Sequence, residues 1–256
     1  MGQAARLTVV DGLAVVRLAR AHGNAINDDL VGNLIAVCGE VEGNPEIRGV
    51  LLAAEGKLFC PGLDLQELVE FDREAMRRFA ERFNACVSAL FNLSRPMVAA
   101  LHGHAVAGGC VLALTADWRV LAEGAMVGLN EVRVGVPFPF GVAMMLKDSV
   151  PRARLEEVAL FGRNYTGPEA IASGLVHEVR PVAGFESYCL ERLAELASRD
   201  ANALAITKRY LRRSTAESMR NADAEFTREF VESWFRPEAR RRIGEVVEQL
   251  RARGKP

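Results

Sequence analysis

One glutamate and two glycine-bearing turns are the residues of this chain whose types and surroundings suit chemistry. Glu131 stands in the largely apolar segment GLNEVRVGVP, although glutamate side chains are normally solvated. Gly62, in the segment KLFCPGLDL, and Gly108, in the segment HGHAVAGGC, each follow a predicted buried strand and precede a predicted helix. Backbone N–H groups at the start of a helix carry partial positive charge, and two such turns on adjacent strands can direct two donors at one oxygen. The two turns therefore favour a pair of amides that stabilises an oxyanion, and Glu131 is a candidate because of its apolar surroundings.

Each of these features also has an ordinary structural alternative. Both turns could be simple strand-to-helix connections, and Glu131 could be a solvated surface residue. Cys110 follows the second turn, but no histidine is assigned next to it, so packing is its expected role. His102 and His104 are expected to be structural, and Asp64 is expected to cap the helix that follows its loop.

Composition and missing motifs narrow the class of protein. Half of the residues are hydrophobic and a quarter are charged, as in globular proteins, and the net charge of −1 argues against binding to nucleic acid. No GxGxxG, GxxxxGK[ST] or GxSxG motif is present. The five cysteines form no CxxC pair and do not group with the four histidines, which predicts reduced, buried thiols and no metal site. No signal peptide, membrane span or peroxisomal address is recognisable, so a cytoplasmic protein is expected.

Short buried strands alternate with helices over the first two thirds of the chain, which indicates an α/β protein with parallel strands. Strands are predicted over residues 7–10, 13–18, 48–54, 96–101 and 118–121. Helices are predicted over residues 28–41, 73–93, 110–115, 185–198, 201–214, 221–234 and 236–251. We expect residues 1–195 to form a core that holds the site. Residues 196–256 are expected to form a helical subdomain that packs on this core or on a neighbouring subunit.

The ordered set of segments resembles the crotonase (enoyl-CoA hydratase/isomerase) superfamily. The first segment matches the family's F-x-x-G-x-D-L loop, the second its G-x-A-x-G-G turn, and the third the segment that bears a catalytic glutamate before a glycine and a proline. The likeness covers residues 5–250. It implies an α/β spiral of ββα turns with a C-terminal helical trimerisation subdomain, and a homotrimer or dimer of trimers. Apolar residues of the C-terminal helices, among them Phe226, Phe230 and Trp234, fit such an interface or packing within one subunit.

The resemblance also implies roles for individual residues in a reaction of fatty-acid β-oxidation. Glu131 is the expected catalytic residue, and the backbone N–H groups of Leu63 and Gly108 are the expected oxyanion hole for a thioester enolate. The expected substrate is an acyl-CoA thioester, and no cofactor is expected because coenzyme A is part of that substrate. Residues expected to bind the substrate are Ala25, Lys57, Phe59, Pro61, Gly62, Val111, Leu129, Val136 and Phe138.

Val111 is the departure from the family pattern that bears on the reaction. The family's hydratases carry a second glutamate at this position, and valine cannot transfer a proton. The segments around Gly108 and Glu131, and LKDS at residues 146–149, resemble Δ3,Δ2-enoyl-CoA isomerases, which work with a single glutamate. We therefore expect a 1,3 proton shift that converts 3-enoyl-CoA to 2-enoyl-CoA.

Two alternatives stay open. The first is an enoyl-CoA hydratase, or another crotonase-type reaction, in which Glu131 works with water. A second carboxylate from residues 67–74 that reached into the site would favour it. The second alternative is an acyl-CoA- or RNA-binding protein that has lost catalysis.

Overall fold

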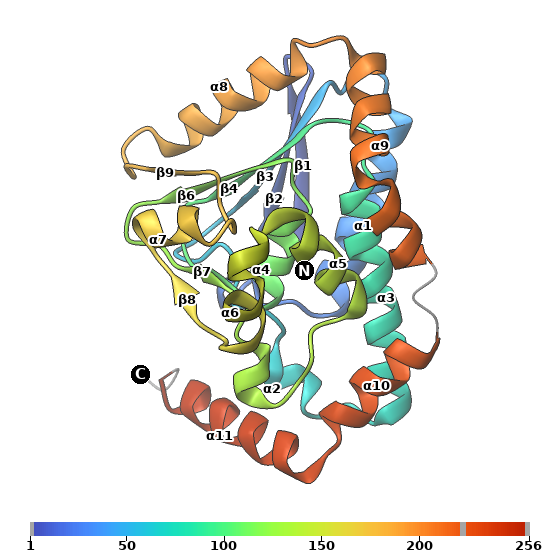
Figure 1. The fold of residues 1–256 in the computed structure, drawn as a ribbon, viewed down its shortest axis with the longest axis vertical. Helices are drawn as coiled ribbons and strands as arrows, with labels where there is room; N and C mark the ends of the chain where they lie inside the picture. Colours follow the sequence, from blue (N-terminus) through green and yellow to red (C-terminus); the bar gives the residue numbers. More distant parts are fainter. Residues whose placement is uncertain (1–2, 221–223, 254–256) are drawn as a thin grey trace.

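The computed structural model describes residues 3–220 and 224–253 of the protein, in which helices surround a larger and a smaller sheet (Figure 1). The strands of the larger sheet lie in the order β1 (Ala5–Val10), β2 (Leu13–Leu18), β3 (Gly49–Ala54), β4 (Met97–Leu101), β6 (Trp118–Ala122) and β9 (Glu178–Arg180). β1 and β2 are antiparallel, and the later pairings are parallel. Asp11 and Gly12, with φ angles of 51° and 76°, make the tight turn between β1 and β2.

The smaller sheet includes strands from the segments in which the sequence predicts the active site. Its strands are β5 (Ala105–Val106), β7 (Val127–Gly128) and β8 (Asn164–Tyr165), with β5 parallel to β7 and β7 antiparallel to β8. Isolated bridges join Cys60 to Ala105 and Ile26 to Leu63. The two glycine-bearing turns and the strand before Glu131 are thus tied together by backbone pairing.

Helices cover both faces of the larger sheet, as the complete burial of β3 and β4 requires. α8 (Phe185–Ala197) packs on β3 and β4, while α1 (Asp28–Gly43) packs on β1 and β2, and α3 (Arg73–Phe91) packs on α1. The remaining helices before α8 are α2 (Leu65–Leu68), α4 (Gly108–Leu114), α5 (Phe140–Ser149), α6 (Leu155–Leu160) and α7 (Gly167–Ala172), with the 3-10 turns η1 (His22–Asn24), η2 (Glu131–Val134) and η3 (Arg152–Arg154). α4 is buried at every residue, so the first turn of this helix is fixed firmly beside the site.

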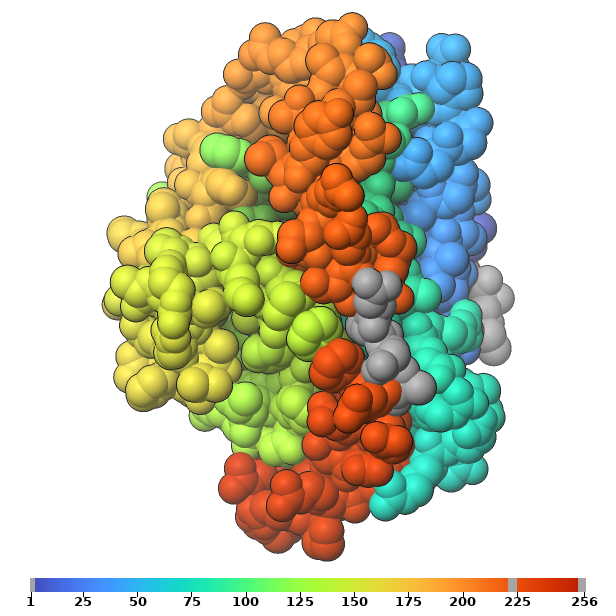
Figure 2. All heavy atoms as spheres, turned by 45° about the vertical axis from the view of Figure 1, so that its right-hand side comes forward, coloured from blue at the N-terminus to red at the C-terminus, as the bar shows by residue number. Residues whose placement is uncertain are grey.

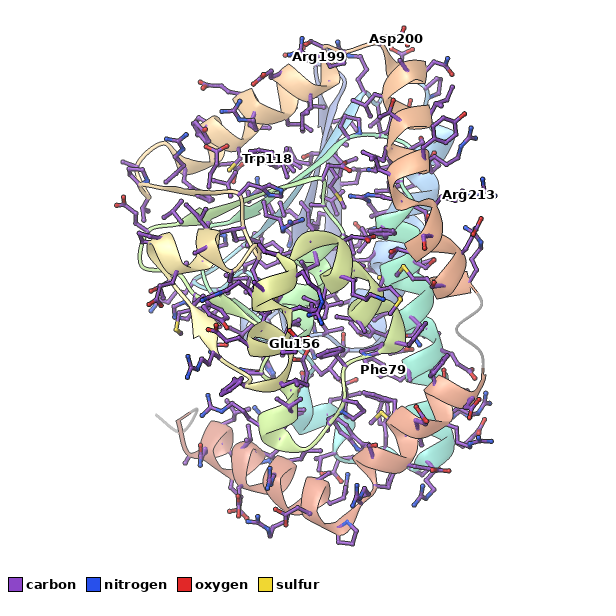
Figure 3. The ribbon with its side chains drawn as sticks, in the orientation of Figure 1. Phe79, Trp118, Glu156, Arg199, Asp200 and Arg213 are labelled. Carbon is purple, nitrogen blue, oxygen red and sulfur yellow. The ribbon has the colours of Figure 1, made fainter. Side chains whose placement is uncertain are left out.

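The C-terminal helices pack on the core of their own chain. α9 (Ala201–Arg220) packs on α3 and α5, α10 (Ala224–Trp234) packs on α3, and α11 (Pro237–Arg253) packs on α2 and η2. Figure 2 shows α9 in orange, and α10 and α11 in red, on the face turned toward the viewer. Trp234 is 1% exposed and Phe230 is 8% exposed, so these aromatic side chains fill the interior of the single chain. On the outer side, Asp200 and Arg213 point into solvent (Figure 3).

The α/β architecture and the helical C-terminal region agree with the sequence prediction, with differences in detail. The helix predicted over 201–214 continues to Arg220, because apolar and small residues keep helical spacing beyond Ser214. The helix predicted from 221 has its first residues, 221–223, outside the described residues, and α10 is described from Ala224. The predicted boundary at residue 195 stays a prediction. No helix within residues 3–220 and 224–253 combines the length and apolar character needed to cross a bilayer.

Candidate active site

A cavity of about 910 Å³ opens between the two glycine-bearing turns, η2 and the C-terminal helices. The predicted site residues that line it are Ala25, Pro61, Leu63, Gly108, Val111, Glu131, Val136 and Phe138. Phe59 and Leu129 instead lie in the core, 0% and 1% exposed, and Lys57 is exposed outside the cavity wall. Gly62 lies directly behind the wall, where its backbone positions Leu63.

The Gly62 and Gly108 turns approach each other closely. A β-carbon built on Gly62 would lie 2.9 Å from the Cβ of Ala107, and one on Gly108 would lie 3.4 Å from the Cα of Gly62. Gly62 also has a φ of 102°, in the region that favours glycine. Both positions therefore require glycine if the two turns are to meet.

The backbone hydrogen bonds that hold the two turns in place do not use the N–H groups of Leu63 and Gly108. Ile26 N–H donates to Gly62 O at 2.8 Å and Asp64 N–H donates to Ile26 O at 2.8 Å, which fixes the backbone around Leu63. Ala107 N–H donates to Gly128 O at 2.8 Å, and α4 begins at the next residue. Within the described parts of the chain, neither Leu63 N–H nor Gly108 N–H has a protein acceptor. Two free amide donors thus lie on the cavity wall.

Ala107, which precedes Gly108, has the backbone angles φ 49° and ψ −126°. An alanine with positive φ is strained by about 1–3 kcal/mol, and such residues persist where the surrounding structure holds them. Here the bond from Ala107 N–H to Gly128 O and the buried α4 provide that support. The strained residue turns the chain so that the first N–H of α4 reaches the cavity.

Glu131 begins η2, and the turn ends at Gly135 in the left-handed conformation with a φ of 79°. The residue as a whole is half-buried, but its Oε2 atom is shielded from solvent and has no hydrogen-bond partner among the residues the structure describes. Burial raises the pKa of this carboxyl to about 7, although a hydrogen bond from its own backbone opposes the shift. A carboxyl that titrates near neutral pH can both take up and return a proton.

Asp64 is the other carboxylate on the cavity wall, and it is engaged by the protein. Arg20 pairs with Asp64 at 2.7 Å and with Glu67 at 3.1 Å, and Asn27 donates to Glu67 at 3.0 Å. Asp64 also accepts from Glu67 N–H and so caps α2, as predicted. The carboxylate oxygens of Asp64 are thus engaged by the Arg20 guanidinium and by the backbone of α2.

The carboxylates of residues 67–74 do not reach the cavity. Glu67 faces Arg20 and Asn27, Glu70 pairs with Arg251 at 3.6 Å, and Glu74 pairs with Arg77 at 2.6 Å. Val111 occupies the wall of α4 instead. Among the described residues, Glu131 is thus the carboxylate on the cavity wall that has no ionic partner.

The other nucleophilic and basic side chains near the turns are buried or hydrogen-bonded to the backbone. Burial raises the pKa of the Cys110 thiol and raises that of Cys60 to about 12, so both stay protonated. His102 Nε2 lies 2.9 Å from Gly56 O, and His104 Nδ1 accepts from Met126 N–H at 3.1 Å. These contacts agree with the packing and structural roles expected for Cys110, His102 and His104.

Part of the cavity wall comes from segments far along the chain from the motifs, and the sequence did not predict it. The additional lining residues include Asn164 of β8, Phe83 of α3, Phe230 and Trp234 of α10, and Val246, Gln249 and Leu250 of α11. The Asn164 side-chain oxygen is buried and finds no partner in the described residues. A two-residue strand such as β8 has no periodicity to recognise, and the placement of α11 depends on tertiary packing, so no local signal pointed to these residues.

The fold is that of the crotonase superfamily. The structure of human mitochondrial delta3-delta2-enoyl-CoA isomerase matches this chain with a TM-score of 0.94, covering 99% of this chain and 100% of that one at 24% identity. The sequence matches the family model for enoyl-CoA hydratase/isomerase over residues 8–252. The protein therefore belongs to the enoyl-CoA hydratase/isomerase family.

Curated relatives carry the names of both activities. Enoyl-CoA delta isomerase 1, mitochondrial, of Homo sapiens is 27% identical over 220 residues, which cover 84% of this chain and 73% of that protein. Short-chain-enoyl-CoA hydratase of Clostridium acetobutylicum is 29% identical over 203 residues, which cover 78% of each. The family supports enoyl-CoA chemistry in fatty-acid metabolism, and identities this low do not distinguish isomerase from hydratase.

Proposed function

We propose that the protein is a Δ3,Δ2-enoyl-CoA isomerase, which moves the double bond of a 3-enoyl-CoA to the 2-position. The observation that carries the proposal is the state of Glu131, whose Oε2 is buried without a partner and whose pKa burial raises to about 7. Val111 stands where the family's hydratases place a second glutamate. A single carboxyl that exchanges protons near neutral pH is sufficient for a 1,3 proton shift.

The first step is removal of a proton from C2 of the substrate. This proton is acidified by the thioester carbonyl and by the neighbouring double bond. Ionised Glu131 takes it up, and the electron pair of the C2–H bond spreads over a dienolate. The thioester oxygen, which gains negative charge, is placed between the N–H groups of Leu63 and Gly108. Each such donor contributes about 3–4 kcal/mol of transition-state stabilisation.

The second step returns the same proton at C4. Glu131 is now neutral, which is the state that its apolar setting favours. Proton delivery to C4 re-forms the carbonyl and leaves the double bond between C2 and C3. Glu131 is then ionised again, so that atoms and charge balance without a cofactor.

The cavity wall supports isomerisation over addition of water. Val111, Val136 and Phe138 contribute apolar side chains to the cavity wall that also holds Glu131. Hydration requires one group to activate water while another delivers a proton to C2. The other wall carboxylate, Asp64, is paired with Arg20 at 2.7 Å.

Enoyl-CoA hydration is the second candidate function, and one specific observation favours it. Asp64 does line the same cavity, so a carboxylate that can orient a water molecule is present. The relative named as a hydratase is as similar to this chain as the one named as an isomerase.

The deciding experiment compares turnover of 3-hexenoyl-CoA with hydration of crotonyl-CoA by the same preparation. We expect isomerisation to be the faster reaction, and we expect Glu131→Gln to lower it by at least about 100-fold. Glu123→Gln is the matched control, since Glu123 is exposed and lies outside the cavity wall. Faster hydration of crotonyl-CoA, or full isomerisation by Glu131→Gln, would reject the proposal.

We also propose a substrate class and an assembly. An acyl-CoA thioester is the proposed substrate, and a homotrimer or dimer of trimers is the proposed assembly. A cytoplasmic location stays a prediction, because the human relative is named as a mitochondrial protein.

A further inference from the structure

Asn164 is a polar residue on the cavity wall that the proposed reaction does not use. Its side chain is half-buried and makes no hydrogen bond with the residues that the structure describes. The amide oxygen Oδ1 is shielded from solvent and the amide nitrogen Nδ2 is not, so the nitrogen is the part of the amide that opens to the cavity. A hydrogen-bond donor thus faces the cavity without a protein acceptor.

The backbone places Asn164 beside the segment that carries Glu131. Asn164 in β8 pairs with Gly128 in β7, and Glu131 follows at the start of η2. Because Gly128 has no side chain, the Asn164 amide lies against it, and a β-carbon built on Gly128 would be 2.7 Å from Asn164 Oδ1. Gly162 precedes β8 and packs on η2, since a β-carbon built there would lie 3.1 Å from Val132 Cγ2. Asn164 is therefore on the part of the wall near Glu131, where the proposed reaction places the acyl moiety.

Shielded polar atoms without a partner gather on this cavity. Among the described residues, the side chains with such an atom are three arginines together with Glu131, Asn164 and Trp234. Each arginine uses another of its nitrogens in a hydrogen bond, whereas Asn164 and Trp234 form none within the described residues. Glu131, Asn164 and Trp234 all line the cavity. Unpaired buried polar groups are costly and uncommon, so their location on one wall indicates a ligand that pairs with them.

We propose that Asn164 determines substrate specificity by donating a hydrogen bond from Nδ2 to a hydroxyl oxygen on the acyl chain, beyond the reacting carbons C2 to C4. The inference deepens the proposed function and rests on it, because it takes the acyl part of a CoA thioester to lie beside Glu131. A hydrocarbon chain that displaces water from the cavity leaves the Asn164 donor unpaired, whereas a hydroxyl oxygen replaces the lost acceptor. A carboxylate on the chain fits less well, because its charge would oppose ionisation of Glu131.

The test compares the dissociation constants of octanoyl-CoA and its 5-, 6-, 7- and 8-hydroxy derivatives, measured by titration calorimetry. These saturated esters have no double bond to move, so binding is measured without a chemical step. We expect the derivative whose hydroxyl group reaches Asn164 to bind at least about fivefold more tightly than octanoyl-CoA, because it pairs a donor that the plain chain leaves unpaired. The other derivatives should bind more weakly than octanoyl-CoA, since their hydroxyl groups lose water without gaining a partner.

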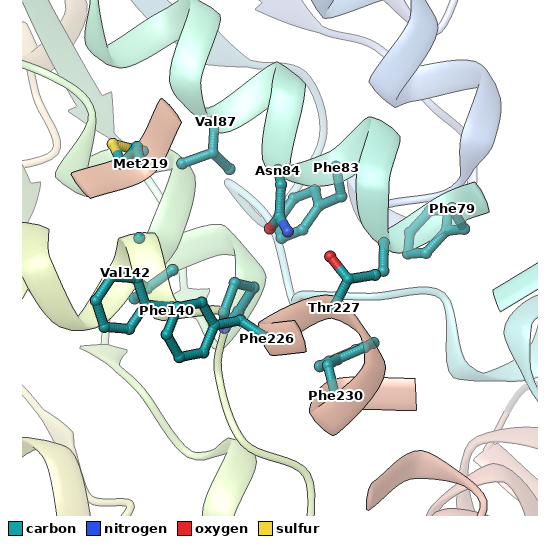
Figure 4. A pocket seen from close by; sticks show the side chains of 13 residues that line it. Phe79, Phe83, Asn84, Val87, Phe140, Val142, Met219, Phe226, Thr227 and Phe230 are labelled. Atoms are coloured by element: carbon teal, nitrogen blue, oxygen red, sulfur yellow. The ribbon is translucent and has the colours of Figure 1, made fainter. Parts of the chain in front are cut away.

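Two variants of Asn164 assign the preference to its amide. Asn164→Leu keeps the approximate size of the side chain and removes the donor, so the preferred derivative should then bind more weakly than octanoyl-CoA. Asn164→Ala tests the same point if the leucine variant does not fold. Asn84→Leu is the matched control, because Asn84 is also half-buried but lies on α3 at a smaller pocket, outside the wall of the larger cavity (Figure 4). This control should keep the preference.

The unmodified protein alone can overturn the inference, if octanoyl-CoA binds it as tightly as every hydroxy derivative does. A preference that survives in the Asn164 variants, or that is lost only in Asn84→Leu, would overturn it as well. The outcome is separate from that of the proposed function. A protein that isomerises 3-hexenoyl-CoA without preferring a hydroxy derivative keeps the proposed function and loses this inference, whereas the preference without turnover of 3-hexenoyl-CoA does the reverse.

Discussion

A β-carbon built on Gly62 would lie 3.2 Å from the backbone nitrogen of Gly108. The two turns come from different strand ends, and they meet this closely because neither residue has a side chain at the point of contact. Their proximity places Leu63 N–H and Gly108 N–H on one cavity wall. In the proposed reaction this geometry is present before substrate binds, so little reorganisation is needed when charge develops on the thioester oxygen.

Replacing Gly62 with alanine should therefore impair catalysis more than stability. The new methyl group meets Ala107 Cβ at 2.9 Å and pushes the two turns apart, so we expect kcat/KM for 3-hexenoyl-CoA to fall about 100-fold. The φ of 102° adds a conformational cost of about 1–2 kcal/mol in the free energy of unfolding. Steady-state kinetics and urea denaturation measure the two effects.

Gly56→Ala is the matched control for that prediction. Gly56 has a similar φ of 83°, but nothing lies within 4 Å of a β-carbon built there. It should therefore lose a comparable amount of stability and keep its kcat/KM. An equal loss of activity in Gly56→Ala and Gly62→Ala would show that backbone strain, rather than contact between the turns, is responsible.

The pH dependence of catalysis should report the buried carboxyl. Glu131 removes a proton only when ionised, and burial raises its pKa to about 7. We expect kcat/KM to fall tenfold per pH unit below about pH 7 and to level off above it. If kcat/KM instead stays constant down to pH 5, the catalytic carboxyl does not have the raised pKa that burial gives Glu131.

The same shift predicts how stability depends on pH. Folding raises the pKa of Glu131 from 4.5 to about 7, so the folded protein holds this proton more tightly than the unfolded chain does. The stability gained from the neutral carboxyl is fully present below about pH 4.5 and is lost as the pH rises to about 7. Glu131→Gln removes this dependence, so between pH 4.5 and 8 its free energy of unfolding should rise by about 3 kcal/mol relative to the unmodified protein. Denaturation curves at both pH values measure this difference.

The sequence predicted those parts of the fold that have long or regular patterns. The continuous apolar runs of β3 and β4, the Asp11-Gly12 turn and the helical spacing along α3 led to the α/β assignment. The smaller sheet was not predicted, because each of its strands has two residues and their pairing is decided by contacts far apart in the chain.

The same contrast between local patterns and long-range contacts applies to the candidate site. Leu63, Gly108, Val111 and Glu131 lie in local motifs, and the structure places them on one cavity wall. The ion pair of Arg20 with Asp64 joins residues 44 positions apart, and no local pattern indicates it. Contributions from α10 and α11 likewise depend on how these helices pack.

Removing Arg20 should destabilise the protein through the carboxylates that it leaves behind. Asp64 is 7% exposed and Arg20 is 16% exposed, so Arg20→Met leaves a buried charge without its partner. We expect the free energy of unfolding to fall by about 3 kcal/mol in urea denaturation at neutral pH. Asp64→Asn in the same chain removes the unpaired charge and should recover part of that loss. No recovery in the double variant would mean that Arg20 acts through Glu67 or its contact with Ala25 O instead.

Val111→Glu should move the protein toward hydration. Val111 is 1% exposed on α4 and lines the cavity with Glu131, so a glutamate at this position supplies the second proton-transfer group that hydration requires. We expect hydration of crotonyl-CoA to rise at least about tenfold, since general acid–base catalysis contributes 100-fold or more when the group is well placed. Isomerisation of 3-hexenoyl-CoA should fall, because a second carboxylate nearby disfavours ionisation of Glu131. Val111→Gln is the matched control: it has nearly the same shape and cannot ionise, so it should gain no hydration. An increase in both variants would attribute the effect to polarity or to admitted water, whereas an increase in Val111→Glu alone would show that the missing carboxylate is what separates the two reactions in this fold.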